Sequence, residues 1–289
     1  MFKSVKELIA ICESENKMIH EVMLEQEMEV TGLSAEAVYA NMDKNLQTME
    51  NALDEGLEGV TSTTGLTGGD AVLIKNYLAT GKSLAGNTLL DAVSKAVATN
   101  EVNAAMGKIC ATPTAGSAGV VPGVLFGLKP RLNPSRRDML NFLLTSGAFG
   151  FVVANNASIS GAAGGCQAEV GSAAAMAAAA TVELAGGTAQ QSAEAFAICL
   201  KNMLGLVCDP VAGLVEVPCV KRNAAGASNA IVSADMALAG VTSRIPTDEV
   251  IEAMYKIGQT MPSALRETGR GGLAGTPTGQ RLKQEIFGD

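Results

Sequence analysis

The chain has 289 residues, of which 47% are hydrophobic and only 17% charged, and its formal net charge at pH 7 is −8. This composition excludes an intrinsically disordered chain, and the acidic balance disfavours nucleic acid and anionic membranes, because both are bound by basic patches. The length allows one large domain or two small ones, with a substantial core in either case.

The N-terminal 60 residues predict two helices. Ser4 and Glu7 have the spacing of a capping box, and apolar residues then recur at helical intervals over 5–23, which predicts one long amphipathic helix. A second helix is predicted over 34–56. His20, the only histidine, lies on the first helix and is expected to be a surface residue rather than a catalyst.

The middle and C-terminal parts of the chain also show helical patterns. Asn133 and Pro134 form a cap and first-turn pair for one of these helices. The further predicted helices begin at Ala71 or cover 87–100, 133–153, 167–184, 188–206 and 246–258.

An alanine tract over 173–180 is the segment that most resembles a membrane span. Glu169 and Glu183 bracket it, and alanine is only weakly apolar, so we expect a buried helix instead. Little of the chain has a strand pattern, and no repeat or linker divides it. We therefore predict an all-α fold, a single mainly helical domain over 1–289.

Three loops rich in glycine and in hydroxyl side chains connect these helices, at 61–70, 112–119 and 267–279. Backbone N–H groups at a helix start, together with hydroxyls, suit a small anion such as a carboxylate, although a flexible capped loop would have the same composition. The first two loops could bind the two ends of one polar substrate. Their candidate contact residues are Thr63, Thr64, Gly65, Thr67, Gly68, Thr114, Gly116 and Ser117.

The N-terminus and the cysteine content both favour an intracellular location. The N-terminus offers no cleavable secretory signal, so a cytoplasmic location is expected. Six cysteines in such a chain indicate reduced thiols or metal ligands rather than a disulfide framework.

Three of the cysteines stand in short breaks between helices. Cys166 follows two glycines, Cys208 precedes Asp-Pro, and Cys219 follows a proline. Glycine and proline end helices and turn the backbone, so these thiols can point into a shared space. Each alone would be read as a buried core residue, but the three together favour a metal or cluster site.

The spacing of these cysteines disfavours zinc. Structural zinc sites use close pairs such as C-x-x-C, and here 41 and 10 residues separate the three. Long gaps instead suit an iron–sulfur cluster assembled from separate loops. Cys12 and Cys199 lie within helical patterns and are expected to be packing residues, whereas Cys110 borders a polar loop and remains a possible fourth ligand.

Segments 61–70, 164–169 and 205–219 carry a resemblance to a known family. They resemble the iron–sulfur L-serine dehydratases of bacteria, over nearly the whole chain, and specifically the alpha, catalytic subunit of the two-chain form. Members built as one chain have a regulatory domain ahead of this region. The resemblance therefore implies a separate beta, regulatory subunit as partner, with self-association as a further expectation.

The resemblance also implies a [4Fe-4S] cluster on Cys166, Cys208 and Cys219, with one iron that lacks a thiolate. Such an iron acts as a Lewis acid on the hydroxyl of L-serine. A base then removes the α-proton, and the aminoacrylate formed tautomerises and hydrolyses to pyruvate and ammonia. The cluster takes over the role that pyridoxal phosphate has in other enzymes.

Four residues are candidates for that base. Lys201 lies in an apolar helical stretch, where it either extends to solvent or is desolvated enough to act as a base. The hydroxyls of Thr63, Thr64 and Ser117 would need local positive charge, from an iron or a helix N-terminus, to ionise.

Three other functions remain open from the sequence. A cysteine desulfidase, or a related amino-acid β-eliminase, would use the same iron and similar loops. A non-catalytic iron–sulfur redox or sensor protein would use the cluster but give the hydroxyl-rich loops no role. A helical scaffold with buried cysteines would use neither.

Overall fold

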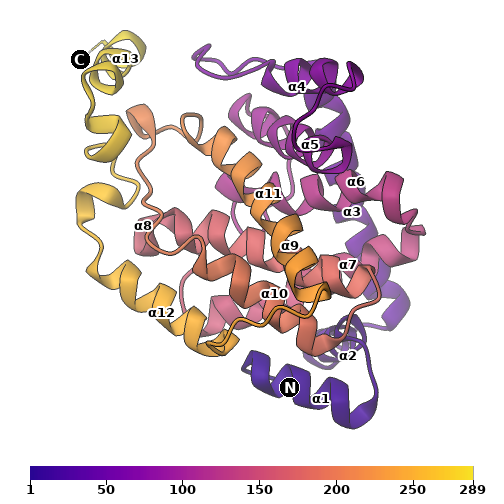
Figure 1. The fold of residues 1–289 in the computed structure, drawn as a ribbon. Helices are drawn as coiled ribbons and strands as arrows, with labels where there is room; N and C mark the ends of the chain where they lie inside the picture. Colours follow the sequence, from indigo (N-terminus) through magenta and orange to yellow (C-terminus); the bar gives the residue numbers. More distant parts are fainter. Residues whose placement is uncertain (289) are drawn as a thin grey trace.

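The fold consists of helices joined by loops and short turns (Figure 1). A computed structural model describes residues 1–288, and in this range there are thirteen α-helices and no β-strand, so the all-α prediction is confirmed. The helices are α1 (Val5–Glu15), α2 (Ile19–Thr31), α3 (Ala35–Glu58), α4 (Asp70–Ala79), α5 (Asn87–Ala104), α6 (Val120–Leu132), α7 (Arg136–Asn156), α8 (Gly161–Gly164), α9 (Ser172–Leu184), α10 (Ala189–Lys201), α11 (Cys219–Leu238), α12 (Thr247–Thr260) and α13 (Pro277–Phe287).

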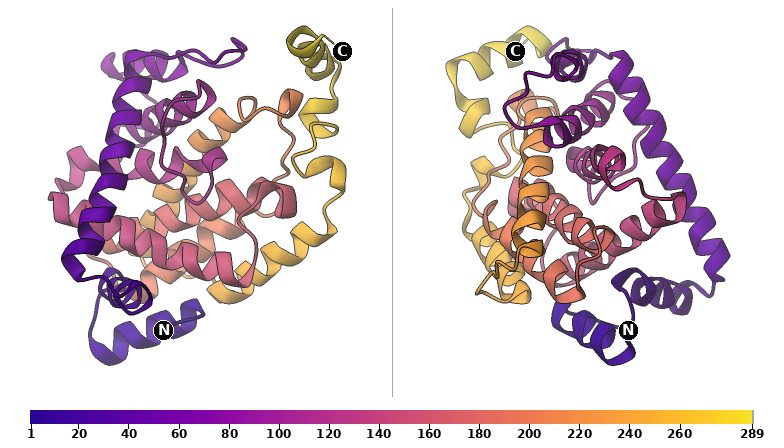
Figure 2. Two further views of the ribbon diagram at one scale, coloured as in Figure 1. Left: turned by 180° about the vertical axis from the view of Figure 1, so that it is seen from behind. Right: turned by 45° about the vertical axis from the view of Figure 1, so that its right-hand side comes forward.

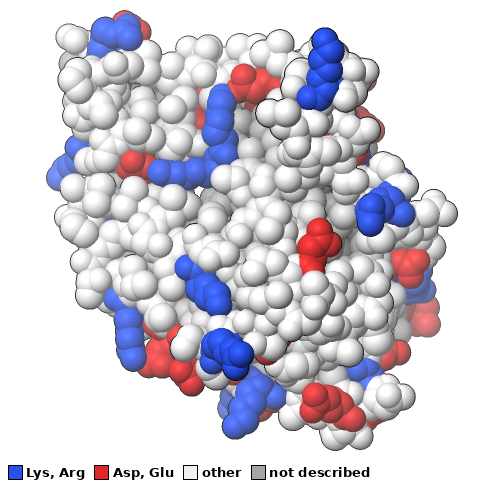
Figure 3. Space-filling view, in the orientation of Figure 1, with Lys and Arg blue, Asp and Glu red and all other residues white. Residues whose placement is uncertain are grey.

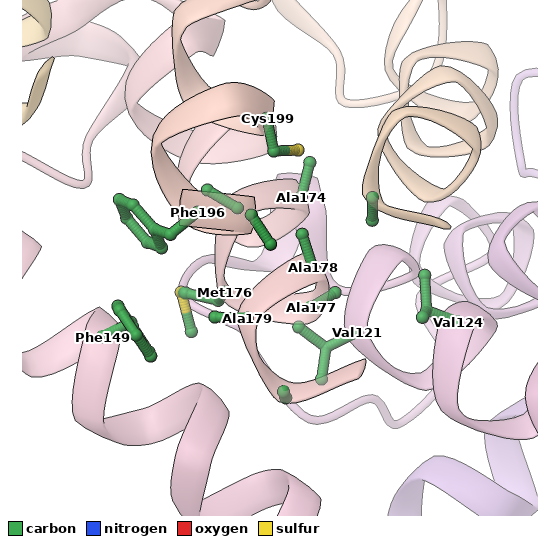
Figure 4. Packing of buried hydrophobic residues seen from close by; sticks show 14 of the residues in the cluster. Val121, Val124, Phe149, Ala174, Met176, Ala177, Ala178, Ala179, Phe196 and Cys199 are labelled. Carbon is green, nitrogen blue, oxygen red and sulfur yellow. The ribbon is translucent and has the colours of Figure 1, made fainter. Parts of the chain in front are cut away.

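Helix α9 lies at the centre of the core. Its alanines Ala173–Ala180 include seven with no exposed surface, and α6, α7, α10 and α11 pack around it. Beside it the rings of Phe149 and Phe196 stack with centroids 5.1 Å apart (Figure 4). The prediction of a buried alanine helix is confirmed. Within residues 1–288, none of the helices combines the length and apolar character needed to cross a bilayer.

Helices α5 and α6 approach each other almost backbone to backbone. A Cβ added to Gly123 would lie 2.6 Å from the Cβ of Ala96, and one added to Gly127 would lie 2.5 Å from the Cα of Ala92. Only glycine fits at these contacts, so the two helices are held close together. Their fixed separation constrains the 112–119 loop, which connects them.

The single N-terminal helix predicted over 5–23 is wrong. The structure has two helices, α1 and α2, because Asn16 adopts a left-handed conformation with φ 52° and ends α1. Asparagine tolerates that conformation better than most residues, so it can act as a C-cap.

His20, which was expected to be a surface residue, is partly exposed and lies away from the cysteines. Its side chain is 16% exposed, and its Nδ1 lies 2.9 Å from Oε1 of the buried Glu183 at the end of α9. The same carboxylate accepts the N–H of Ile19 at 2.6 Å. Docking of the first turn of α2 on this carboxylate therefore shields most of the ring from solvent.

Several other helix ends differ from the prediction. Asn133 ends α6 instead of starting α7, which is capped by the hydroxyl of Ser135. Helix α10 ends at Lys201, five residues earlier than predicted, so the chain is free to turn toward Cys208. Helices α6, α8, α11 and α13 lie outside the predicted ranges.

The long helix α3 runs along one edge of the molecule, and the C-terminal segment with α12 and α13 runs along the opposite edge (Figure 2). On the face shown in Figure 3, charged side chains are scattered and wide uncharged areas separate them. The three cysteine-bearing segments lie between the central helices and the C-terminal segment.

The close contact of α5 and α6 leads to a stability prediction. Gly123→Ala should lower the free energy of unfolding by about 1 to 3 kcal/mol, since the added methyl overlaps Ala96 and forces the helices apart. Gly147→Ala in α7 is the matched control. No atom would lie within 4 Å of its Cβ, so it should stabilise the chain by about 0.5 to 1 kcal/mol. Urea unfolding measures the free energy of unfolding of both variants. Equal effects of the two substitutions would contradict the close approach of α5 and α6.

Candidate metal centre

Cys166, Cys208 and Cys219 line one cavity of about 320 Å³. Cys166 stands between α8 and a π-helical turn, η2 (Gln167–Gly171), Cys208 lies in the loop after α10, and Cys219 is the first residue of α11. All three are buried and none forms a disulfide. Three segments that are far apart in the sequence thus place their cysteines around one cavity.

Only glycine can occupy the position directly before Cys166. Gly165 has φ 77°, and a Cβ there would lie 2.8 Å from the carbonyl oxygen of Leu206. On the other side of the cysteine, the buried Gln167 accepts a hydrogen bond from the N–H of Gly205 at 2.9 Å. These contacts join the Cys166 segment to the loop that carries Cys208.

The C-terminal tail holds Cys208 from the other side. The N–H of Cys208 donates to the carbonyl of Leu265 at 2.8 Å, and its carbonyl accepts the N–H of Glu267 at 2.7 Å. The Glu267 side chain lines the cavity. The third glycine-rich loop, at 267–279, is therefore part of the site.

Glu169 is a site residue that was not among the candidates from the sequence. Its carboxylate oxygen and the sulfurs of Cys166 and Cys208 all lie within 4.8 Å of one another. Gly161 lies against these groups, and a Cβ there would lie 2.6 Å from Glu169 Oε2 and 3.1 Å from the sulfur of Cys208. The position of Glu169, three residues after Cys166 and on the same helical face, was the signal in the sequence that could have identified it.

The surroundings change the acidity of these groups. Burial raises the pKa of Glu169, while a hydrogen bond from the Thr114 hydroxyl acts in the opposite direction. A hydrogen bond from the Cys208 thiol lowers the pKa of Cys166, and the same bond raises that of Cys208. Burial raises the pKa of Cys219 to about 12. Cys166 is therefore the most acidic of the three thiols.

Arg222 and Asp209 form a buried ion pair beside the cysteines. The Nη2 of Arg222 lies 2.8 Å from Oδ1 of Asp209, and its Nη1 lies 3.6 Å from the sulfur of Cys166. Neither residue was a candidate from the sequence, because nothing local distinguishes them from other charged residues.

The 61–70 loop is attached to the cysteine segments, although its candidate residues do not line the cavity itself. Thr64 donates to Oε2 of the buried Glu216 at 2.8 Å, and Thr67 donates to the same oxygen at 3.2 Å. Thr63 is exposed, and Gly65 and Gly68 form the turn with positive φ. The loop is thus fixed to the segment that leads to Cys219.

The 112–119 loop is divided between the cavity and the core. Thr114 and Gly116 line the cavity. Ser117 is fully buried and donates to the carbonyl of Thr112 at 3.1 Å. The carbonyl of Gly116 accepts from Nδ2 of Asn223 at 2.8 Å, which ties the loop to α11.

Lys201 lies apart from the cavity wall. Its Nζ donates to the carbonyl of Ser243 at 2.8 Å. The other three cysteines are also elsewhere. Cys12 and Cys199 are buried, Cys110 is half-buried, and the sulfur of Cys199 lies 3.2 Å from Nδ2 of Asn229.

The donor set fits an iron–sulfur cluster with three thiolates. Soft thiolate ligands select such clusters, and the three cysteines line one cavity. The absence of a Cβ at Gly161 leaves that space open. Among residues 1–288 no fourth cysteine lines it, and carboxylates of Glu169 and Glu267 stand on the remaining wall.

Comparison with known proteins agrees with the resemblance. A family model described as "Serine dehydratase alpha chain" matches residues 14–274. A Bacillus subtilis protein named "Probable L-serine dehydratase, alpha chain" is 73% identical over 288 residues, 100% of this chain and 96% of that protein. The "L-serine dehydratase, alpha chain" of Peptoniphilus asaccharolyticus is 44% identical over 99% of each chain. An "L-serine dehydratase" of Haemophilus influenzae is 37% identical over 94% of this chain, but only 61% of its own length is covered.

Proposed function

The chain belongs to the serine dehydratase alpha-chain family, and on that basis we propose that it converts L-serine to pyruvate and ammonia at a [4Fe-4S] cluster held by Cys166, Cys208 and Cys219. The observation that carries the cluster is the convergence of these thiols on one cavity. A cytoplasmic location belongs to this proposal, because reduced thiols and an exposed iron need a reducing compartment.

The cavity offers L-serine both polar and charged contacts. When bound, a cluster with three thiolates supplies an open iron that acts as a Lewis acid on the substrate hydroxyl. Glu169 and Glu267 can accept hydrogen bonds from the substrate ammonium group, and Thr114 presents a hydroxyl to the same space.

The proton acceptor must stand where it can reach the α-carbon of the bound substrate. Lys201, Ser117, Thr63 and Thr64 are the candidates from the sequence, and Glu169 joins them because its carboxylate lies on the cavity wall. Loss of the α-proton to this group and of the hydroxyl as water leaves aminoacrylate. Tautomerisation and hydrolysis of aminoacrylate give pyruvate and ammonia.

We further propose that the chain acts as one catalytic domain over 1–289 with a separate beta, regulatory subunit. Two relatives are named as alpha chains and match almost from end to end. The Haemophilus relative is longer, and its additional part is absent from the aligned region. A second chain would supply the corresponding regulatory fold.

The cluster is tested by removing its ligands one at a time. Anaerobically purified enzyme should contain iron and sulfide and form pyruvate from L-serine. Alanine at Cys166, Cys208 or Cys219 should abolish both the bound iron and sulfide and the formation of pyruvate. Alanine at Cys12, Cys110 or Cys199 should leave them unchanged.

Air exposure extends the same test. An iron without a thiolate is easily lost to oxidants, so activity should decay in air and return with ferrous iron and a reductant. A cluster that is stable in air and bound by four thiolates would contradict the Lewis-acid role and favour a redox protein. Pyruvate from L-cysteine but not from L-serine would favour a desulfidase.

The hydroxyl-rich loops should bind the substrate carboxylate and amine. In the free chain Thr64 donates to Glu216 and Ser117 to the carbonyl of Thr112. If these hydroxyls turn to the substrate when it binds, Thr64→Ala and Ser117→Ala should lower kcat/KM roughly ten- to a hundredfold, the effect of losing a hydrogen bond to a charged group. Thr63→Ala, at an exposed position, reports whether that hydroxyl turns inward when substrate binds. Iron content is the control, and wild-type kinetics in all three would make these loops purely structural.

The beta subunit is tested by size measurement of the chain alone and after co-expression. We expect a larger complex and a change in activity or its regulation on co-expression, and self-association of the chain alone would add a further species. Full activity with no effect of any second subunit would contradict the proposed partnership.

A further inference from the structure

Arg222 contacts all three cysteine-bearing segments. It lies on α11, three residues after Cys219. From there its Nη1 donates to the carbonyl of Val207, just before Cys208, at 2.9 Å, and lies 3.6 Å from the sulfur of Cys166. Its Nη2 pairs with Asp209, just after Cys208, at 2.8 Å.

We propose that Arg222 is a positioning residue that holds the three thiols in the arrangement that accepts the cluster. This inference rests on the proposed function as far as the cluster is concerned. The arrangement of the thiols in the metal-free chain is a separate property that can be measured by itself.

The guanidinium group suits this task better than an ammonium group. It is planar and presents several N–H donors in fixed directions, so it can serve a carboxylate, a carbonyl and a sulfur at the same time. The side chains of Arg222 and Asp209 are 15% and 4% exposed. At that burial, charge-assisted hydrogen bonds are strong, and an unpaired partner would be costly.

Asp209 extends the contact to the C-terminal tail. Its Oδ2 accepts the N–H of Leu273 at 2.7 Å. A Cβ at Gly272 would lie 2.3 Å from the same oxygen, so only glycine allows the tail to come this close. Through Asp209, Arg222 also fixes the loop that places Glu267 on the cavity wall.

The experiment compares Arg222→Met, Arg222→Lys and Asp209→Asn with the wild type. In the metal-free chain, a short bifunctional thiol reagent cross-links Cys166 to Cys208, and mass spectrometry quantifies the linked peptides. Iron and sulfide per chain are measured after anaerobic reconstitution, together with the visible spectrum of the loaded enzyme. Arg136→Gln is the matched control, because Arg136 pairs with Asp43 and Glu50 away from the cavity.

Arg222→Met should cross-link roughly tenfold more slowly, as expected for loss of a charge-assisted hydrogen bond, and hold less iron. Arg222→Lys should restore part of the cross-linking rate and part of the iron content, and Arg136→Gln should match the wild type in both. Wild-type cross-linking and iron loading in Arg222→Met would overturn the proposal. If that variant does not fold, wild-type cross-linking in both Arg222→Lys and Asp209→Asn would overturn it. A wild-type chain without iron would contradict the proposed function, and the cross-linking rates would still decide the role of Arg222.

Discussion

The close packing around the alanine face of α9 is the constraint on which the rest of the structure depends. Alanine side chains end at Cβ, so neighbouring helices can approach closely, and the tight contacts supply dispersion energy with little loss of side-chain entropy. Because Cys166 stands a few residues before α9 and Cys219 begins the adjacent α11, this packing also sets the distance between two of the three thiols. The core and the site are therefore not separate parts of the fold.

Buried polar side chains connect the loops of the site to that framework. Gln167, Glu216 and Asn223 are all buried, and each bonds a loop that is distant in sequence. A buried polar group is costly unless its hydrogen bonds are satisfied, so each of these residues favours one loop conformation over the alternatives. A cavity lined by loops acquires in this way the rigidity that preorganised binding requires.

The site also combines charges of both signs in a small volume. Glu169 and Glu267 stand on the cavity wall, and Arg222 stands beside Cys166. Three thiolates add negative charge when a cluster is bound, and a nearby guanidinium offsets part of it.

The sequence by itself determined the helical class and the alanine core helix, and it singled out the three cysteines as candidate ligands, because each has a local signal. Periodicity, caps and helix breakers act over a few residues and can be read without the fold. Other features depended on packing between distant segments. His20 is largely shielded because α2 docks on Glu183. Glu169 reaches the cavity, and Arg222 reaches the sulfur of Cys166, only because η2 and α11 meet there. Nothing in a short stretch of sequence specifies which face of a helix meets a segment dozens of residues away, so only the tertiary structure decided these contacts.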